Sequence, residues 1–298
     1  MKNRVEHYFA DGSQWLASSY STKQSMAAER LELVKSLARE IRPQSVLDIG
    51  CGDGRLLKSM EFIERRVGID YSVDMLRRAA EDSANDISYK QLDINNLPID
   101  KFHTIGKFDL ITMMGLIHYL KEPFLSLSVL CETVKSGGWL AVSFRNRLFN
   151  ICPKSKYSLS DLTVADYHRL AAESRFWLNF DRDSSPLDEH VSDDEIGGLI
   201  VNKIKSNSWY EGITDPEWNI ECFEFWRQFT PFEAIVLFNK VGLSAVELYA
   251  LNCEGVYYQN KDKIISAPCQ LPMSTSFVLL GKLQSKSVPV HGQKSATS

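Results

Sequence analysis

The segment that decides the fold is Val46 to Leu57, VLDIGCGDGRLL, in which an apolar run is followed at once by closely spaced glycines. Gly50, Gly52 and Gly54 lack a Cβ atom, which permits backbone with positive φ and a close approach by a ligand. A buried strand, a glycine-rich turn and a helix in this order form the ligand-binding end of an open α/β sheet. The free N–H groups at the start of that helix would receive a phosphate or a carboxylate.

Acidic side chains near these glycines restrict the ligand further. Asp70 ends the next predicted strand, where a carboxylate can accept hydrogen bonds from both ribose hydroxyls. Asp48 and Asp53 would repel a pyrophosphate, but they suit a ligand that carries an ammonium group and a sulfonium. The glycine spacing also departs from the GxGxxG pattern of dinucleotide sites. A NAD(P)-dependent oxidoreductase therefore stays as an alternative with less support.

Strands and helices alternate along the first half of the chain. The expected strands cover residues 46–49, 66–70, 87–93, 108–113 and 139–144, and the expected helices cover 23–40, 55–60, 72–80 and 123–135. This alternation predicts a parallel sheet with right-handed crossovers. Regular patterns return with a capping box at Thr230 and Glu233, a helix that ends at Gly242, and strands over 245–251 and 276–283.

The organisation of the chain follows from these patterns. Residues 150–229 are aromatic and acidic with weak periodicity, which indicates an insertion that covers one edge of the core. Its aromatic residues suggest a lid with an apolar inner surface; they are Trp177, Trp209, Trp218, Phe223, Phe225 and Trp226. The tail is rich in Ser, Lys and Pro, which is typical of disorder. We predict N-terminal cap helices over 1–40, a cofactor-binding core over 41–148, a substrate lid over 150–229, the end of the core over 230–283, and a disordered tail over 284–298.

Composition narrows the class of partner and the compartment. The chain has 298 residues, 44% of them hydrophobic, and a net charge of −4, so the mild acidity weighs against nucleic acid. We see neither the apolar region of a signal peptide nor a run long enough to span a bilayer, so we expect a cytoplasmic protein without a membrane partner. The cysteines lack metal-like spacing and are expected to be reduced thiols, with no metal site. The oligomeric state stays open.

Five segments in this order resemble the motif set of class I S-adenosylmethionine-dependent methyltransferases: DIGCGDG, VGIDYSVDML, YKQLDINNLP, FDLITMMGLIHYL and VKSGGWLAVSF. The resemblance covers residues 20–148 and resumes in TPFEAIVLFNKVGLSAVELY. It implies an α/β fold with a Rossmann-like seven-stranded methyltransferase sheet, whose last strand is antiparallel. The insertion would form a mainly helical lid between strands five and six. The resemblance also implies S-adenosyl-L-methionine as the cofactor and methyl transfer to a small molecule, with oxygen favoured over nitrogen and nitrogen over carbon.

The resemblance also implies which residues contact the cofactor. They are Tyr20, Arg30, Asp48, Gly50, Cys51, Gly52, Asp70, Tyr71, Met75, Asp93, Ile94, Met114 and Gly115. The acidic residues of the first two motifs would hold the methionine amino group and the ribose. Tyr71 and Met75 would line the adenine ring, which Asp93 and Ile94 of the third motif would hold. Arg30 and the N-terminal Tyr8 and Tyr20 would close over the cofactor. A solvated charge for Arg30, and plain packing for the tyrosines, are the alternatives.

Candidate catalytic and substrate residues follow strands four and five. His118 lies near the expected position of the methyl group, where it would act as a general base or only order its loop. Arg145, Asn146 and Arg147 lie at the carboxyl-end crevice, where a guanidinium would pair with a carboxylate or phosphate unless it is only a surface charge. Tyr157 completes the substrate set. A catalytically silent cofactor-binding subunit stays open as an alternative function.

Overall fold

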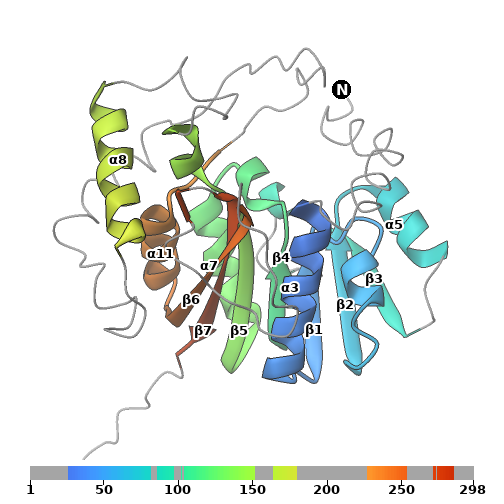
Figure 1. The fold of residues 1–298 in the computed structure, drawn as a ribbon. Coiled ribbons are helices and arrows are strands. Elements are labelled where there is room, and N and C mark those ends of the chain that lie inside the picture. Colours follow the sequence, from blue (N-terminus) through green and yellow to red (C-terminus); the bar gives the residue numbers. More distant parts are fainter. Residues whose placement is uncertain are drawn as a thin grey trace, which may run out of the picture.

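The computed structural model describes residues 26–81, 86–96, 102, 104–151, 164–179, 227–253, 271–272 and 274–284. Seven strands form one sheet, which Figure 1 shows with helices packed on both faces. The strands are β1 (Ser45–Ile49), β2 (Arg65–Asp70), β3 (Ile87–Gln91), β4 (Phe108–Met113), β5 (Val134–Arg145), β6 (Leu243–Cys253) and β7 (Ser274–Leu283). The helices are α3 (Met26–Ile41), α4 (Arg55–Lys58), α5 (Val73–Glu81), α7 (Pro123–Thr133), α8 (Val164–Leu178) and α11 (Pro231–Lys240), with short 3₁₀ turns η1 (Ile94–Asn96), η2 (Ile117–Tyr119) and η3 (Arg147–Ile151).

The strand order confirms the predicted sheet. It reads β3-β2-β1-β4-β5-β7-β6, in which β1 to β5 pair in parallel and β7 runs antiparallel to both β5 and β6. The chain moves outward from β1 to β3 and then returns to place β4 on the other side of β1. Ligands of open α/β sheets bind at the carboxyl ends of the strands beside such a reversal. The expected ligand site therefore lies at the ends of β1 and β4.

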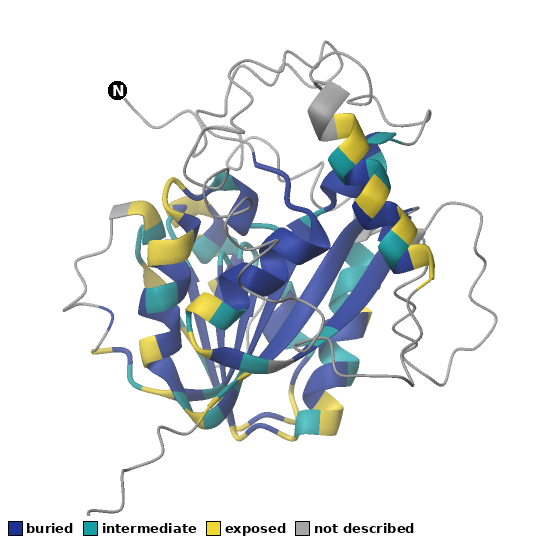
Figure 2. Ribbon diagram, turned by 90° about the vertical axis from the view of Figure 1, so that its left-hand side faces the viewer, coloured by how far each residue is buried: buried dark blue, intermediate teal, exposed yellow. Residues whose placement is uncertain are grey.

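Each face of the sheet is covered by its own helices. On one face, Leu33 and Leu37 of α3 are buried against Ala141 of β5 and Val278 of β7. On the other face, α7 and α11 pack on β4, β5 and β7, and Phe144 stacks on Phe277 with ring centroids 5.2 Å apart. Strands buried on both faces read as continuous apolar runs. Figure 2 shows this arrangement as a dark blue layer of buried strands between helices that are partly exposed.

The fifth strand begins earlier than its sequence indicated. The predicted helix to residue 135 ends at Thr133, and β5 starts directly at Val134 instead of Trp139. A register shift places Val134 opposite Phe108 and Trp139 opposite Leu110, and Gly137 has a φ of 73°. The glycines therefore lie in an irregular stretch inside the strand, where its pairing with β4 shifts register, rather than in a turn before it. The third strand, in contrast, ends at Gln91, before the predicted Asp93, because η1 begins at Ile94.

Two distant stretches of the chain share the sheet, since β5 pairs with β7 along its length. This pairing is compatible with the predicted core of 41–148 plus 230–283, while the division into core and lid stays a prediction. Of the lid, the structure describes residues 150–151, 164–179 and 227–229, and it forms α8 there. Residues 1–25 and all of the predicted tail except Gln284 lie outside the described residues. No helix in the described part of the chain is long and apolar enough to cross a membrane.

Candidate functional site

The glycine-rich turn after β1 follows a backbone path that side chains would oppose. Gly50, Gly52 and Gly54 have φ values of 74°, 52° and 72°. A Cβ on Gly50 would lie 3.0 Å from Leu116 Cδ2, and one on Gly54 would overlap the Tyr89 hydroxyl. A Cβ on Gly52 would meet no atom within 4 Å. Gly52 therefore leaves its backbone open on that side, as a closely approaching ligand requires.

Asp70 ties the turn to the end of β2. One carboxylate oxygen accepts the Gly52 N–H at 2.8 Å, and the other accepts the Ser72 N–H at 2.9 Å. Burial raises the pKa of Asp70, while these backbone hydrogen bonds act in the opposite direction. A carboxylate can accept about four hydrogen bonds, so Asp70, which also interacts with the Tyr71 backbone, keeps acceptor capacity for a ligand hydroxyl.

Asp48, near the end of β1, is the more deeply buried of the two acids, with 3% of its surface exposed. Thr112 on β4 donates a hydroxyl hydrogen bond of 2.7 Å to its Oδ1. The pKa of Asp48 is raised to about 7, chiefly by burial and also by nearby Asp70, while the hydrogen bond from Thr112 and the charge of Arg30 act in the opposite direction. Burial disfavours the ionised form of this carboxylate, and a cationic ligand beside it would stabilise that form.

Three residues from different elements meet at the end of β4. Arg30 of α3 donates from Nη1 to Ser143 Oγ at 3.3 Å, and the Gly115 N–H donates to the same oxygen at 2.7 Å. Gly115 has a φ of 75°, and a Cβ there would lie 3.0 Å from Arg30 Nη1. The guanidinium thus lies directly against the bare Gly115 backbone.

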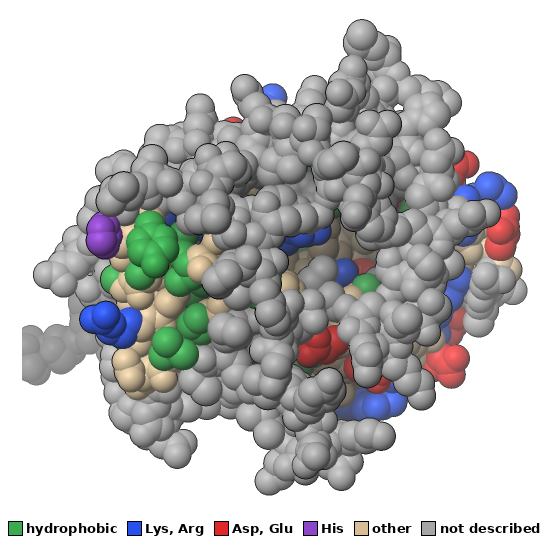
Figure 3. Space-filling view, turned by 45° about the horizontal axis from the view of Figure 1, so that its top comes forward, with side chains coloured by type: hydrophobic (Ala, Val, Ile, Leu, Met, Phe, Trp, Pro, Cys, Tyr) green, Lys and Arg blue, Asp and Glu red, His purple; other side chains and the backbone are tan. Residues whose placement is uncertain are grey.

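His118 in η2 is buried beside this group, with 5% of its surface exposed. Burial lowers the pKa of His118 well below its usual value, and the positive charges of Arg145 and Arg30 lower it further. The imidazole is therefore neutral near pH 7. Its backbone carbonyl accepts the Arg227 N–H at 2.9 Å. In Figure 3 the top of the molecule as drawn in Figure 1 comes forward. Lys or Arg and Asp or Glu side chains are visible near the middle of this view.

The comparisons with known proteins agree with this geometry. Residues 47–142 match the sequence profile of the family described as methyltransferase domain. The chain contains a class I S-adenosylmethionine-dependent methyltransferase domain. The cofactor of that family is S-adenosylmethionine, so the nicotinamide alternative is set aside.

Curated relatives of this methyltransferase domain include enzymes that methylate oxygen. A ubiquinone biosynthesis O-methyltransferase of Albidiferax ferrireducens is 32% identical over 123 residues, which cover 40% of this chain and 47% of that protein. One from Leptothrix cholodnii is 24% identical over 204 residues, or 65% of this chain and 83% of that protein. The chain spans about half the length of the first of these relatives and of its Bordetella avium counterpart.

A solved structure has the same fold as the methyltransferase domain. It is the magnesium protoporphyrin IX methyltransferase of Synechocystis PCC 6803 with bound SAH. The two chains are 14% identical, with a TM-score of 0.51, and the match covers 94% of this chain and 98% of that one. At this identity the likeness concerns the fold alone.

Residues predicted for the adenine gather beyond Asp70. The Leu92 N–H donates to the Asp70 carbonyl at 3.0 Å, which brings the end of β3 beside the end of β2. Asp93 accepts the Asn95 N–H at 2.9 Å and opens η1 at Ile94. The other members of this set lie at the start of α5: Tyr71 is half-buried, and Met75 is buried with its N–H directed to Ser72 Oγ. Two turns from neighbouring strands therefore form one edge of the site.

Three further cofactor candidates have clear surroundings. Met114 and Gly115 directly follow β4, and Met114 packs against the apolar clusters beneath α3. Cys51 is buried in the glycine-rich turn, where burial and the neighbouring Asp48 raise the pKa of its thiol well above the usual value. The thiol therefore stays protonated and is no nucleophile.

Two of the predicted substrate residues are engaged within the fold instead. Asn146 donates to the Leu271 and Ser274 carbonyls at 2.7 and 2.9 Å, and its Oδ1 accepts the Leu148 N–H at 3.0 Å. Buried Arg147 lies 3.9 Å from Glu233 Oε1. These contacts account for the polar groups of Asn146 and bring Arg147 close to Glu233, and the substrate role of all three residues stays a prediction. The sequence pattern placed all three after β5 but could not show where their side chains point.

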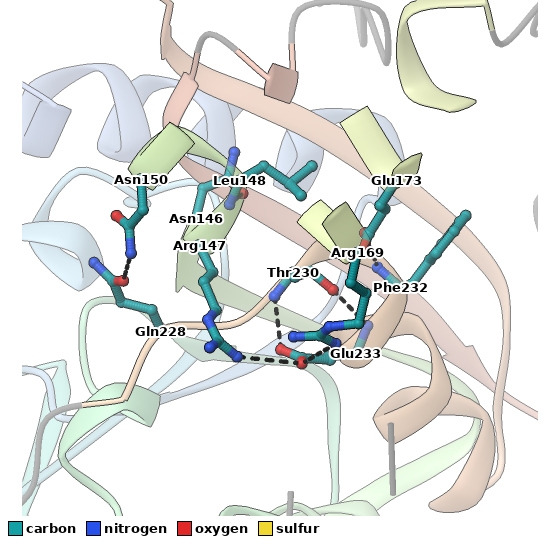
Figure 4. A network of polar contacts seen from close by, with 10 residues as sticks. All are labelled: Asn146, Arg147, Leu148, Asn150, Arg169, Glu173, Gln228, Thr230, Phe232 and Glu233. Atoms are coloured by element: carbon teal, nitrogen blue, oxygen red, sulfur yellow. Dashed lines mark hydrogen bonds and ion pairs between the residues drawn. The ribbon is translucent and has the colours of Figure 1, made fainter. Parts of the chain in front are cut away.

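A buried polar network joins α8 to the start of α11, and sequence reasoning found only part of it (Figure 4). The predicted capping box is confirmed, with Thr230 and Glu233 bonded to each other's backbone N–H groups. Glu173 of α8, which sequence reasoning missed, accepts the Phe232 N–H at 3.0 Å. Arg169 of α8 donates to Glu233 at 3.0 Å. The weak periodicity of the insertion gave no signal for either contact.

Several candidates of the sequence lie outside the described residues. They are Tyr8, Tyr20, Tyr157, Trp209, Trp218, Phe223, Phe225 and Trp226. Trp177, which was expected on the inner surface of the lid, is buried in the main apolar core and donates from Nε1 to Glu173 at 3.2 Å. Ser143 and Thr112 are two polar residues of the site that sequence reasoning missed, because a lone hydroxyl within an apolar strand carries no distinctive pattern.

Proposed function

We propose that this protein transfers a methyl group from S-adenosylmethionine to an oxygen atom of a small molecule. The observation that carries the proposal is the division of charge at one end of the sheet. Buried Asp48 and half-buried Asp70 line the turn after β1, whereas neutral His118 and Arg145 follow β4 and β5. One side suits a cationic cofactor, and the other suits an acceptor with an acidic hydroxyl or an anionic group.

The residues present fit the proposed cofactor. When bound, S-adenosylmethionine supplies an electrophilic methyl group on a positively charged sulfur. Asp48 would neutralise the ammonium group, which relieves the burial of a carboxylate with a raised pKa. Asp70 would accept the ribose hydroxyls with the acceptor capacity that its backbone hydrogen bonds leave over. The bare backbone of Gly52 would admit the ligand between them.

On the acceptor side, the proposal gives His118 the task of taking the proton from a hydroxyl. A neutral imidazole can accept a proton directly, and the low pKa of His118 keeps it neutral over a wide pH range. Arg145 would attract an anionic group of the acceptor and so fix the hydroxyl beside His118. The relatives named as O-methyltransferases support oxygen over nitrogen and carbon as the acceptor atom.

Calorimetric titration with S-adenosylmethionine, SAH, NAD and NADP tests the cofactor, and SAH release with a panel of phenols, amines and carboxylic acids tests transfer. We expect micromolar binding of the first two ligands, no dinucleotide binding, and SAH release with a hydroxylated acceptor. Binding without turnover on any acceptor would favour the catalytically silent subunit, and failure to bind S-adenosylmethionine would overturn the proposal.

Asp70→Ala is the variant that tests the assigned site. Loss of hydrogen bonds to a charged group costs about 1.5–3 kcal/mol, so we expect affinity for SAH to fall roughly tenfold to a hundredfold. Asp74→Ala is the matched control, because Asp74 is an exposed aspartate on the neighbouring α5. Equal affinities for both variants and the natural protein would place the cofactor elsewhere.

A further inference from the structure

The side chain of Arg30 reaches the site because of its place on α3. Residues three, four and seven positions later, Leu33, Val34 and Leu37, are buried against the sheet, so Arg30 shares their face of the helix. It lies one turn closer to the start of α3, at the level of the strand ends. An arginine at the end of an apolar stripe is directed inward, and its guanidinium needs a polar partner there.

That partner is Ser143, which is 2% exposed on β5. Its Oγ accepts both the Arg30 guanidinium at 3.3 Å and the Gly115 N–H at 2.7 Å. Its neighbour on the same face of β5, Ala141, packs on α3. One hydroxyl therefore connects α3, the end of β4 and β5, at the place where the acidic and basic halves of the site meet.

We propose that Ser143 is a positioning residue that holds Arg30 for the carboxylate end of the cofactor. This inference rests on the proposed function, because it takes S-adenosylmethionine as the ligand. The guanidinium is fixed between the hydroxyl of Ser143 and the bare backbone of Gly115, on which a Cβ would lie within 3.0 Å of it. A fixed guanidinium loses less conformational entropy when it binds a carboxylate, which raises affinity for ligands that carry one.

A serine that only supported the local fold would affect every ligand of the site alike. The test therefore compares SAH, which carries the amino acid end, with 5′-methylthioadenosine, which lacks it. By calorimetry we expect Ser143→Ala to lower the affinity for SAH roughly tenfold and the affinity for 5′-methylthioadenosine less than about threefold, as fits the loss of one hydrogen bond to a charged group. Equal losses for both ligands, or none for either, would overturn the inference.

A double-mutant cycle separates positioning from an independent effect. If Ser143 acts through Arg30, Arg30→Met combined with Ser143→Ala binds SAH no more weakly than Arg30→Met alone. Additive losses in the cycle would contradict the inference. Ser143→Thr keeps the hydroxyl and is expected to retain most of the SAH affinity, which covers the case in which Ser143→Ala folds poorly.

Ser276→Ala is the matched control. Ser276 is a buried serine of β7 opposite Arg145, and its hydroxyl makes no hydrogen bond among the described residues. Its replacement is expected to leave the affinity for both ligands unchanged. Failure of the natural protein to bind SAH at all would overturn the proposed function together with this inference, whereas SAH binding that ignores Ser143 would overturn this inference alone.

Discussion

At the scale of single residues, the site is governed by acids and a base whose burial opposes their charged forms. The positive charge of Arg30 lowers the pKa of both Asp48 and His118. For Asp48 this effect is smaller than that of burial, so the pKa rises to about 7. For His118 burial and charge act in the same direction. The charge of a bound ligand therefore influences whether Asp48 and His118 are protonated.

Cofactor affinity is expected to depend on pH through Asp48. A ligand ammonium favours the ionised carboxylate, so the pKa of Asp48 falls on binding and a proton is released below about pH 7. Affinity for SAH should therefore rise between about pH 6 and pH 7 and then level off. Titrations in two buffers of different ionisation enthalpy measure the released proton. In Asp48→Asn we expect no proton release from this position, so any remaining pH dependence comes from the ligand. An unchanged proton release in this variant would contradict the assignment of Asp48 as the titrating group.

The acid limb of the pH–rate profile reports on His118. A general base must be neutral, and the pKa of His118 lies well below its usual value, so kcat should persist in mild acid. Arg145→Met removes a positive charge and should move the acid limb to higher pH. His118→Ala should lower kcat by about a hundredfold or more while SAH affinity is kept. A loss below about tenfold would argue that His118 only orders its loop.

At the scale of elements, the start of α11 is stabilised from outside its own sequence. Thr230 and Glu233 satisfy two N–H groups of the first turn, Pro231 has none, and Glu173 of α8 accepts the Phe232 N–H (Figure 4). Arg169 and Arg147 both contact Glu233, from α8 and η3. The described part of the insertion is therefore bound to the core by charge and hydrogen bonds together with apolar packing.

Glu173→Gln tests the cost of that buried acid. Burial raises the pKa of Glu173 from 4.5 to about 7. Because the folded state binds the proton more tightly, the stability that Glu173 contributes is present below about pH 4.5 and is lost as pH rises toward about 7. We expect the variant to match the natural protein near pH 5 and to exceed its free energy of unfolding by roughly 2–3 kcal/mol near pH 8.

Denaturant unfolding at both pH values measures this difference. Glu233→Gln is the control, because it removes the negative charge between two arginines and is expected to destabilise the protein at either pH. A Glu173→Gln variant that is less stable than the natural protein near pH 8 would show that the charged form is preferred in the network.

At the scale of the whole molecule, the sequence predicts features that depend on local pattern. It does not predict strand bounds and side-chain directions that depend on contacts between distant residues. Periodicity indicated the seven strands, and the capping box of α11 followed from Thr230-Pro231-Phe232-Glu233 alone. The start of β5 was not predicted, because the irregular stretch at its glycines depends on pairing with β4, which the local sequence does not show. Arg147 was proposed to contact a substrate, and its neighbour Glu233, which lies far along the chain, gave no signal in the sequence. Side-chain direction after a strand depends on such partners.

The position of β7 inside the sheet has a consequence for synthesis of the chain. Its register pairs Trp139 with Lys282 and Arg145 with Ser276. One edge of β5 therefore stays unpaired during synthesis until β7 has left the ribosome. Until then the backbone N–H and C=O groups along this edge of β5 have no strand to pair with, and its apolar side chains are not yet covered by β7. Unpaired edges of this kind promote aggregation. Closing so long a loop also costs chain entropy before any pairing repays it. Pairing of β7 is therefore the step that removes this open edge of β5 from the nascent chain.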